Sequence, residues 1–327
     1  MRSRTRIAAA TTLVTAVLAV GAAVATNPYL LVRAQFERQR VNAGLGEAEG
    51  PVADHRWVYA LSDAAPAGAP TRVMLHGFTG SKENWYPLAE RLRGRYRLLI
   101  PDLPGGGESE RQPGADYGFV AQAGRVAAFI ERVARRPGPQ RGEIVLLGHS
   151  MGGGIAALTA ARYPQLVDRV GLFDGAGVHF RDNPFGRDVL AGNNPFSVDD
   201  RDSLRRYIDT VFHRDGAKPW TPWPASSGLI AYRRDAAAFE QAVLDRIGRG
   251  PERFAPGVAA ADIGQPALLL WGRQDSVIDA SAMDLYAEQM PQMTTVLLDD
   301  CGHMCRMEPP AAVAAAVTLM IQRGLPR

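Results

Sequence analysis

Short apolar runs alternate with helical patterns along most of the chain. Runs typical of strands occur at residues 72–75, 96–100, 143–147, 170–173, 267–271 and 294–298. Several of them are almost wholly apolar, as expected for strands that are covered on both faces. Helical patterns lie between or after them, at residues 119–134, 151–163, 280–290 and 310–322. This alternation predicts an α/β fold with a mostly parallel sheet and helices on both faces.

The alternation breaks between about residues 178 and 262. Helical patterns at residues 201–212 and 236–248 flank a segment rich in Pro and Trp at 219–224, and no convincing strand occurs there. We expect a helical cap at residues 179–261, lying over the strand ends where open α/β sheets bind their ligands. The core then comprises residues 56–178 and 262–327, and residues 27–55 form a partly helical N-terminal extension.

Residues 1–26 differ from the rest of the chain. Arg2, Arg4 and Arg6 precede residues 7–25, which are mostly apolar and carry no charge. This pattern is typical of a secretory signal peptide, with residues 23–25 (AVA) as a small-x-small cleavage site. An uncleaved membrane anchor is the alternative, because about 20 apolar residues can span a bilayer. Both interpretations predict a protein body that is secreted, periplasmic or anchored to a membrane.

The composition allows one large α/β domain with an insertion. The chain has 327 residues with 46% hydrophobic content. Its basic and acidic residues nearly balance, and the resulting net charge of +3 does not indicate a nucleic-acid partner. The only two cysteines are Cys301 and Cys305. With His303 between them they lack a fourth ligand for a structural zinc ion, so we expect no metal and two inert thiols. A local disulfide is the alternative in an exported protein.

The sequence Gly148-His149-Ser150-Met151-Gly152 fits G-x-S-x-G and lies between a predicted strand and a predicted helix. A nucleophile on a tight strand-to-helix turn needs glycine two positions to either side, because side chains there would collide. We therefore interpret Ser150 as a nucleophile. His149 is adjacent in sequence and is expected to point away from the Ser150 hydroxyl.

A serine hydroxyl needs a base that removes its proton. His303 follows the last predicted strand, and a loop there can return over the edge of the sheet that carries Ser150. The imidazole in turn needs a carboxylate to orient it. Asp275 follows the strand at 267–271 and completes the chain order Ser-Asp-His. Asp174 follows the strand before it and is the alternative acid.

The oxyanion that forms during acyl transfer needs preorganised hydrogen-bond donors. One donor is expected to be the backbone N–H of Met151, directly after the nucleophile. The second is expected from the loop that begins His76-Gly77-Phe78, where Gly77 permits a tight turn and the Phe78 amide donates.

These motifs together resemble the α/β-hydrolase superfamily from about residue 56 to the C-terminus. The motifs that carry the resemblance are HGFTG at 76–80, DLPGGGES at 102–109, GHSMGG at 148–153, WGRQD at 271–275 and CGHM at 301–304. Within the superfamily, the chain resembles the bacterial lipases of the Moraxella and Psychrobacter type, through its leader, HGFTGSKENW, DGAGV at 174–178 and NNPF at 193–196.

The resemblance implies an α/β-hydrolase fold with a mostly parallel sheet of the eight-stranded type. It also implies hydrolysis of carboxylic esters, including acylglycerols, by Ser150, Asp275 and His303 without a cofactor. The expected partner is a small-molecule or lipid ester, with membrane association through the N-terminal segment in the anchored alternative. Trp220, Trp223, Phe212 and Leu229 would suit acyl chains, but ordinary packing explains them equally well. Hydrolysis of a C–C bond in a dienoic acid is the second enzymatic interpretation, because fold alone does not choose between these reactions.

Overall fold

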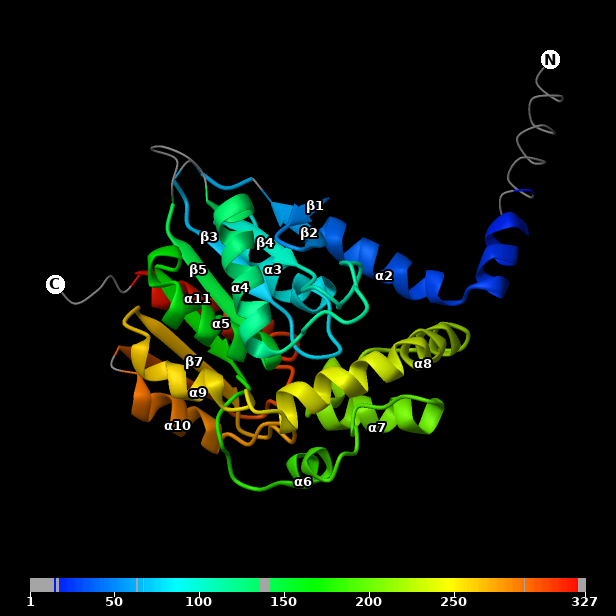
Figure 1. The fold of residues 1–327 in the computed structure, drawn as a ribbon. Coiled ribbons are helices and arrows are strands. Elements are labelled where there is room, and N and C mark those ends of the chain that lie inside the picture. The colour runs from blue at the N-terminus through cyan, green and yellow to red at the C-terminus, as the bar shows by residue number, and fades with distance from the viewer. Residues whose placement is uncertain are drawn as a thin grey trace, which may run out of the picture.

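The computed structural model describes residue 15 and residues 18–62, 64–66, 68–135, 142–290 and 292–322 (Figure 1). Its centre is an eight-stranded sheet in the order β1-β2-β4-β3-β5-β6-β7-β8. The strands are β1 (Gly46–Val52), β2 (His55–Ser62), β3 (Thr71–Leu75), β4 (Arg97–Pro101), β5 (Ile144–His149), β6 (Arg169–Phe173), β7 (Ala267–Gly272) and β8 (Met293–Leu298). The pairs from β4 to β8 are all parallel. The expected mostly parallel sheet is therefore confirmed.

The first two strands were not predicted. They form an antiparallel hairpin in which Val52 pairs with His55, and β2 adds antiparallel to β4. β1 reads GEAEGPV, and most of its residues are exposed or half-buried. Gly, Pro and Glu are unfavourable in strands, so an exposed edge strand of this composition leaves little hydrophobic signal.

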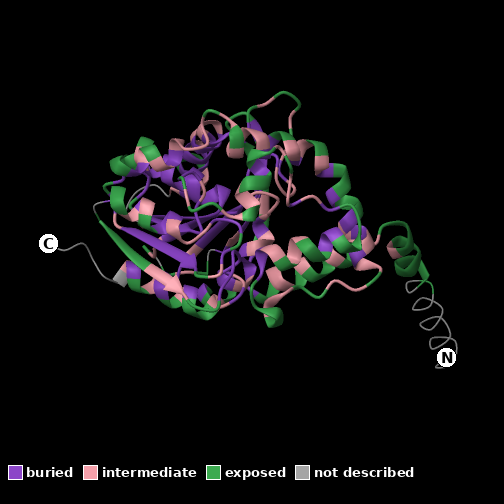
Figure 2. Ribbon diagram, turned by 90° about the horizontal axis from the view of Figure 1, so that it is seen from below, coloured by how far each residue is buried: buried purple, intermediate pink, exposed green. Residues whose placement is uncertain are grey.

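Helices cover both faces of the sheet. The helices are α2 (Tyr29–Asn42), α3 (Tyr86–Leu92), α4 (Phe119–Phe129), α5 (Met151–Arg162), α6 (Pro184–Leu190), α7 (Arg201–Val211), α8 (Ala225–Leu244), α9 (Ala255–Ala259), α10 (Ser281–Gln289) and α11 (Pro310–Gln322). Successive side chains of a strand point to opposite faces. Val73 accordingly packs in the apolar cluster that contains residues of α4, α5 and α10, whereas Met74 packs in the cluster with α3 and α11. Figure 2 shows buried residues concentrated in the centre of the sheet, whereas the edge strands β1 and β8 are mostly exposed or half-buried.

Between β6 and β7 the chain forms only helical and irregular structure, including α6, α7, α8 and α9. We call residues 184–262 the helical insertion. Its longest helix, α8, lies beside the N-terminal helix α2, where the rings of Tyr29 and Tyr232 stack with their centroids 4.7 Å apart (Figure 1). The insertion lies beyond the carboxyl ends of β5, β6 and β7, so it faces the loops that carry the predicted site.

Of the predicted leader, residues 1–14, 16 and 17 lie outside the described part of the chain. Residue 15 and residues 18–26 are helical, and most of those side chains are exposed. Among the helices that the structure describes, none has the length and apolar character needed to cross a membrane.

Candidate active site

Ser150 lies on a sharp turn between β5 and α5. Its backbone has φ 54° and ψ −120°, an unusual conformation for a residue with a side chain. A Cβ on Gly148 would lie 2.0 Å from the carbonyl oxygen of Gly152, and a Cβ on Gly152 would lie 2.5 Å from that of His76. Only glycine fits at these two positions. The turn places Ser150 at the N-terminus of α5, where the helix end is electropositive.

The loop after β3 passes directly against this turn. A Cβ on Gly77 would lie 3.0 Å from the Cβ of Ser150, so glycine is needed for the close approach. The Phe78 and Met151 amides donate no hydrogen bond to another group in the described residues, so both are available to an oxyanion.

His76 is a fully buried support of this loop. Its Nδ1 donates to the Gly77 carbonyl at 2.8 Å, and its Nε2 accepts from the Leu103 amide at 2.9 Å. Burial lowers the pKa of His76 to about 4. The imidazole is therefore neutral near pH 7, and it joins the loop after β3 to the DLPGGGES loop after β4.

His303 and Asp275 are hydrogen bonded. The Nδ1 of His303 lies 2.8 Å from Oδ2 of Asp275, and both residues are buried. Oδ1 of Asp275 accepts from the amides of Val277 and Ile278, at 2.8 and 3.0 Å. A carboxylate can only accept, so the proton of the imidazole lies on Nδ1 and Nε2 keeps a free lone pair. This tautomer is the one that a general base requires.

His149 links the serine turn to the histidine loop. Its Nε2 donates to the backbone carbonyl of His303 at 2.7 Å, and the two rings lie 4.6 Å apart between centroids. The Ser150 hydroxyl forms no hydrogen bond with another described residue. The two loops are thus in contact, but the Ser150–His303 hydrogen bond is not formed in this structure, as is common without substrate.

Asp174, the alternative acid, is not bonded to His303. Its Oδ1 accepts from the Gly272 amide at 2.9 Å, and its Oδ2 is buried without a hydrogen-bond partner. Burial and the nearby Asp275 charge raise the pKa of Asp174 well above its usual value. Potential metal-ligating atoms of Asp174, Asp275 and His303 lie within 4.8 Å of one another. However, a 2.8 Å hydrogen bond between the last two leaves no room for an ion between them.

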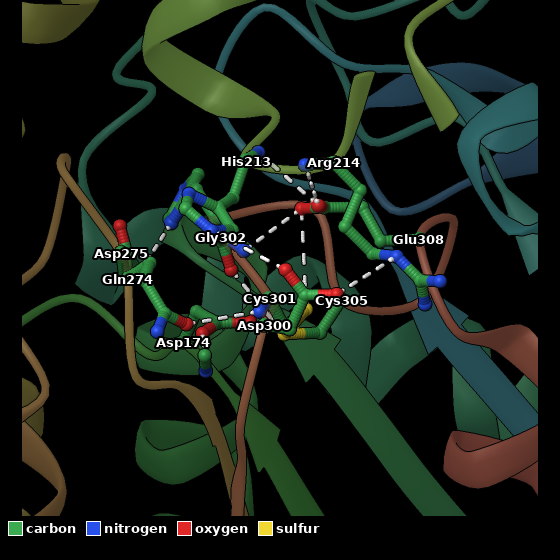
Figure 3. The surroundings of a disulfide bond; sticks show 12 residues. Asp174, His213, Arg214, Gln274, Asp275, Asp300, Cys301, Gly302, Cys305 and Glu308 are labelled. Atoms are coloured by element: carbon green, nitrogen blue, oxygen red, sulfur yellow. Dashed lines mark hydrogen bonds and ion pairs between the residues drawn. A yellow bond between two sulfur atoms is a disulfide. The ribbon is translucent and has the colours of Figure 1, made fainter. Parts of the chain in front are cut away.

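The expectation of two inert thiols is wrong. Cys301 and Cys305 are joined by a disulfide, and their Cα atoms lie 5.7 Å apart, within the usual range (Figure 3). The turn through His303 brings them together, so the disulfide closes a ring around the residue that carries the imidazole.

Glu308 is a buried carboxylate that the sequence motifs did not indicate. It accepts from the amides of Gly302, His213 and Arg214, at 2.9, 3.1 and 2.8 Å (Figure 3). His213 and Arg214 follow α7, so Glu308 joins the histidine loop to the helical insertion. A Glu five positions after His303 was the only available signal.

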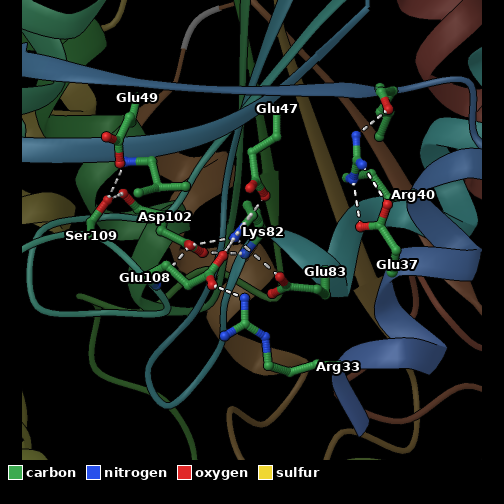
Figure 4. A network of polar contacts seen from close by, with 12 residues as sticks. Arg33, Glu37, Arg40, Glu47, Glu49, Lys82, Glu83, Asp102, Glu108 and Ser109 are labelled. Carbon is green, nitrogen blue, oxygen red and sulfur yellow. Dashed lines mark hydrogen bonds and ion pairs between the residues drawn. The ribbon is translucent and has the colours of Figure 1, made fainter. Parts of the chain in front are cut away.

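Lys82 was also missed. Its buried ammonium lies 2.7 to 3.5 Å from carboxylates of Glu47, Glu83, Asp102 and Glu108 (Figure 4). Burial opposes the charge, but these carboxylates raise the pKa of Lys82 above its usual value. The network ties β1, the loop after β3 and the DLPGGGES loop together, and thereby supports the Phe78 segment.

Ser150 opens into a cavity of about 160 Å³ with a largely apolar wall. Six phenylalanines line it: Phe78, Phe119, Phe180, Phe185, Phe196 and Phe254. Trp220 and Trp223, for which the sequence left acyl-chain contact and ordinary packing equally open, do not line this cavity and are both exposed.

Comparison with known proteins agrees with this arrangement. The family model described as alpha/beta hydrolase fold matches residues 72–310. Lipase 3 of Moraxella sp. (strain TA144) is 30% identical over 255 residues, which are 77% of this chain and 77% of that protein. Lipase 1 of Psychrobacter immobilis is 30% identical over 281 residues, 84% of this chain and 83% of that protein. The crystal structure of a membrane phospholipase A superposes with a TM-score of 0.83 at 31% identity, covering 94% of this chain and 96% of that one. The chain therefore belongs to the α/β-hydrolase fold family.

Proposed function

We propose that this protein is a serine hydrolase that cleaves carboxylic esters through an acyl-enzyme. Ser150 is the nucleophile, His303 the general base and Asp275 the residue that orients the base. The observation that carries the proposal is the buried 2.8 Å hydrogen bond from Nδ1 of His303 to Asp275, on a loop bonded to the turn that carries Ser150.

The reaction follows from this geometry. Nε2 of His303 takes the proton of the Ser150 hydroxyl while the oxygen attacks the ester carbonyl. The amides of Phe78 and Met151 donate to the oxyanion of the tetrahedral intermediate. The imidazolium, stabilised by Asp275, then gives its proton to the leaving alcohol, and the same residues activate water for deacylation.

The lining of the cavity favours an acyl chain as its occupant. Apolar and aromatic side chains surround Ser150, so an aliphatic chain would be desolvated there without unpaired polar groups. The lipases of Moraxella and Psychrobacter support a lipid ester, including acylglycerol, as the substrate class. Export, or anchoring through the N-terminal segment, would bring the enzyme to such lipids.

The C–C bond hydrolase remains the second candidate. Its dienoic acid substrates carry carboxylates and call for cationic groups in the pocket. Among the described residues that line the cavity, Arg253 is the one with a permanent positive charge, and its guanidinium lies over the ring of Phe254. Arg253 is the specific feature that favours this alternative.

The test is turnover of p-nitrophenyl esters of increasing chain length by the wild type and Ser150→Ala. We expect a loss of at least about 10³-fold in the variant, with unchanged circular dichroism and thermal unfolding. A variant that retains most of its turnover would refute the nucleophile. Faster hydrolysis of a dienoic acid than of any ester would favour the C–C bond alternative.

A further inference from the structure

Two of the five tryptophans of this chain lie on the surface of the helical insertion. Trp220 and Trp223 are 88% and 71% exposed, whereas Trp57, Trp85 and Trp271 are completely buried. The two exposed residues belong to residues 219–224 (PWTPWP), a segment without charge. Single exposed apolar side chains are common, but two indoles within four positions form a local apolar patch. We call Trp220 and Trp223 the tryptophan patch.

The tryptophan patch lies next to the N-terminal helix. Gly228, in the first turn of α8, approaches the main chain of Pro28 and Tyr29 so closely that a Cβ would lie 2.2 Å from the Tyr29 nitrogen. One turn further along α8, Tyr232 stacks on the Tyr29 ring. Figure 1 shows the N-terminal ends of α2 and α8 at the same end of the molecule, where helical residues 18–26 leave the body of the protein.

Helical residues 18–26 present a second uncharged surface at this end. Leu18 and Val20 are 68% and 63% exposed, and residues 7–32 contain no charged side chain. Residues 18–26 and residues 219–224, about 200 positions apart in the sequence, therefore lie at the same end of the molecule. The length of the apolar run at residues 7–25 is close to the roughly 20 residues that span the hydrocarbon core of a bilayer.

We propose that the tryptophan patch and residues 18–26 form one surface that docks on a lipid bilayer. The indole combines a large apolar ring with an N–H donor, which suits the boundary between acyl chains and head groups. Pro219, Pro222 and Pro224 restrict the backbone around both indoles, so little conformational entropy is lost when they insert. In the sequence, the uncharged run extends from residue 18 back to residue 7, and this favours lipid over a second copy of the chain.

A series of adjoining hollows lies between α2 and Ser150. Tyr29, Leu229 and Tyr232 line a groove of about 560 Å³ between α2 and α8. Tyr232 also lines a smaller cavity of about 50 Å³, which shares Phe78 and Met151 with the cavity at Ser150. Tyr29 and Leu229 follow residues 18–26 and 219–224 closely in the sequence, so the groove begins near the docking surface. The consequence for lipid hydrolysis rests on the proposed function, but the docking itself does not.

Tryptophan fluorescence of the full chain in phosphatidylcholine vesicles tests the docking. Because the other three tryptophans are buried in the core, lipid brominated in the upper acyl chain should quench Trp220 and Trp223 selectively. We expect quenching in the wild type and its loss in the double variant Trp220→Ser/Trp223→Ser. Val258→Ser is the matched control, because Val258 is an apolar residue that is 78% exposed on α9, which packs on α5. The tryptophan fluorescence of this variant should be quenched as in the wild type.

A second readout is turnover of one ester, presented either in solution or dissolved in the vesicles. We expect the double variant to match the wild type on soluble ester and to fall about tenfold on vesicle-borne ester. Absence of quenching in vesicle-bound wild type would overturn the proposal, as would equal quenching in the double variant. The proposal would also be overturned if the protein had twice its monomer mass and lipid did not quench the indoles, because self-association would then shield them. If soluble ester is not hydrolysed at all, the proposed function fails while quenching still decides the docking.

Discussion

Asp275→Asn should remove most of the catalytic rate through a change of tautomer. Oδ1 of Asp275 accepts from the amides of Val277 and Ile278, so the carboxamide oxygen of an asparagine must occupy that position. Its NH2 group then lies where Oδ2 was, 2.8 Å from Nδ1 of His303. An NH2 group can only donate, so Nδ1 must accept and the proton must move to Nε2. A protonated Nε2 cannot take the proton of Ser150.

The expected loss is about 10⁴-fold in kcat, or about 5 kcal/mol of transition-state stabilisation. The fold should persist, because both main-chain hydrogen bonds to the side chain at position 275 remain possible. The assay is steady-state hydrolysis of p-nitrophenyl butyrate, with circular dichroism and thermal unfolding as controls for the fold.

Asp174→Asn is the matched comparison. Oδ1 of Asp174 accepts from Gly272, and an asparagine oxygen can do the same. Its Oδ2 has no hydrogen-bond partner, so an NH2 group there displaces no existing bond. We expect a change in kcat of less than about tenfold. A larger loss from Asp174→Asn than from Asp275→Asn would refute the reasoning and assign the orienting role to Asp174.

Three further predictions concern stability. Replacing Cys301 and Cys305 by alanine should lower the free energy of unfolding by about 2 kcal/mol, because the disulfide no longer reduces the entropy of the unfolded chain by closing this short loop. Thermal unfolding in the absence of reductant measures the change. Glu308→Gln should lower the free energy of unfolding by about 2–3 kcal/mol, because its NH2 group would face backbone N–H groups that now donate to the carboxylate. An unchanged melting temperature would contradict this. His76 has a folded-state pKa of about 4, below its unfolded value, so stability is complete above about pH 6.5 and is lost as the pH falls toward 4. Urea unfolding should show a decrease of about 2 kcal/mol between pH 6.5 and 5, and His76→Gln should show a smaller one.

Hydrophobic patterning predicted the central part of the fold well. The strands β3 to β7 are short apolar runs with helical patterns between or after them, and burial on both faces makes such runs conspicuous. The edge strand β8 was also predicted, although its residues are exposed or half-buried. β1 was missed because it is a largely exposed edge strand, and β2 was missed although it lies between β1 and β4 and most of its residues are buried. α3 was not predicted because a helix of seven residues is too short to show a clear hydrophobic periodicity.

In the candidate site, too, some residues could be predicted from the sequence and others could not. Ser150, His303 and Asp275 stand in local motifs with fixed spacing, so the amino-acid sequence by itself indicates them. Lys82 and Glu308 act through partners that only the fold brings together: Lys82 contacts Asp102, which is 20 positions away, and Glu308 contacts His213, which is 95 positions away. The disulfide was only the alternative to two inert thiols, because residue spacing alone does not fix the distance between two Cα atoms.

The same long-range contacts join the helical insertion to the loop that carries His303. The amide of Met304 donates to the carbonyl of Val211 at the end of α7, and Glu308 accepts from the two amides that follow Phe212. On its other side the histidine loop is held at β7, where a Cβ on Gly272 would lie 2.1 Å from the Gly302 carbonyl oxygen. A shift of α7 must therefore break buried hydrogen bonds or shift the loop that carries His303. These hydrogen bonds, together with the disulfide that closes the loop, couple the position of the imidazole to the position of the insertion.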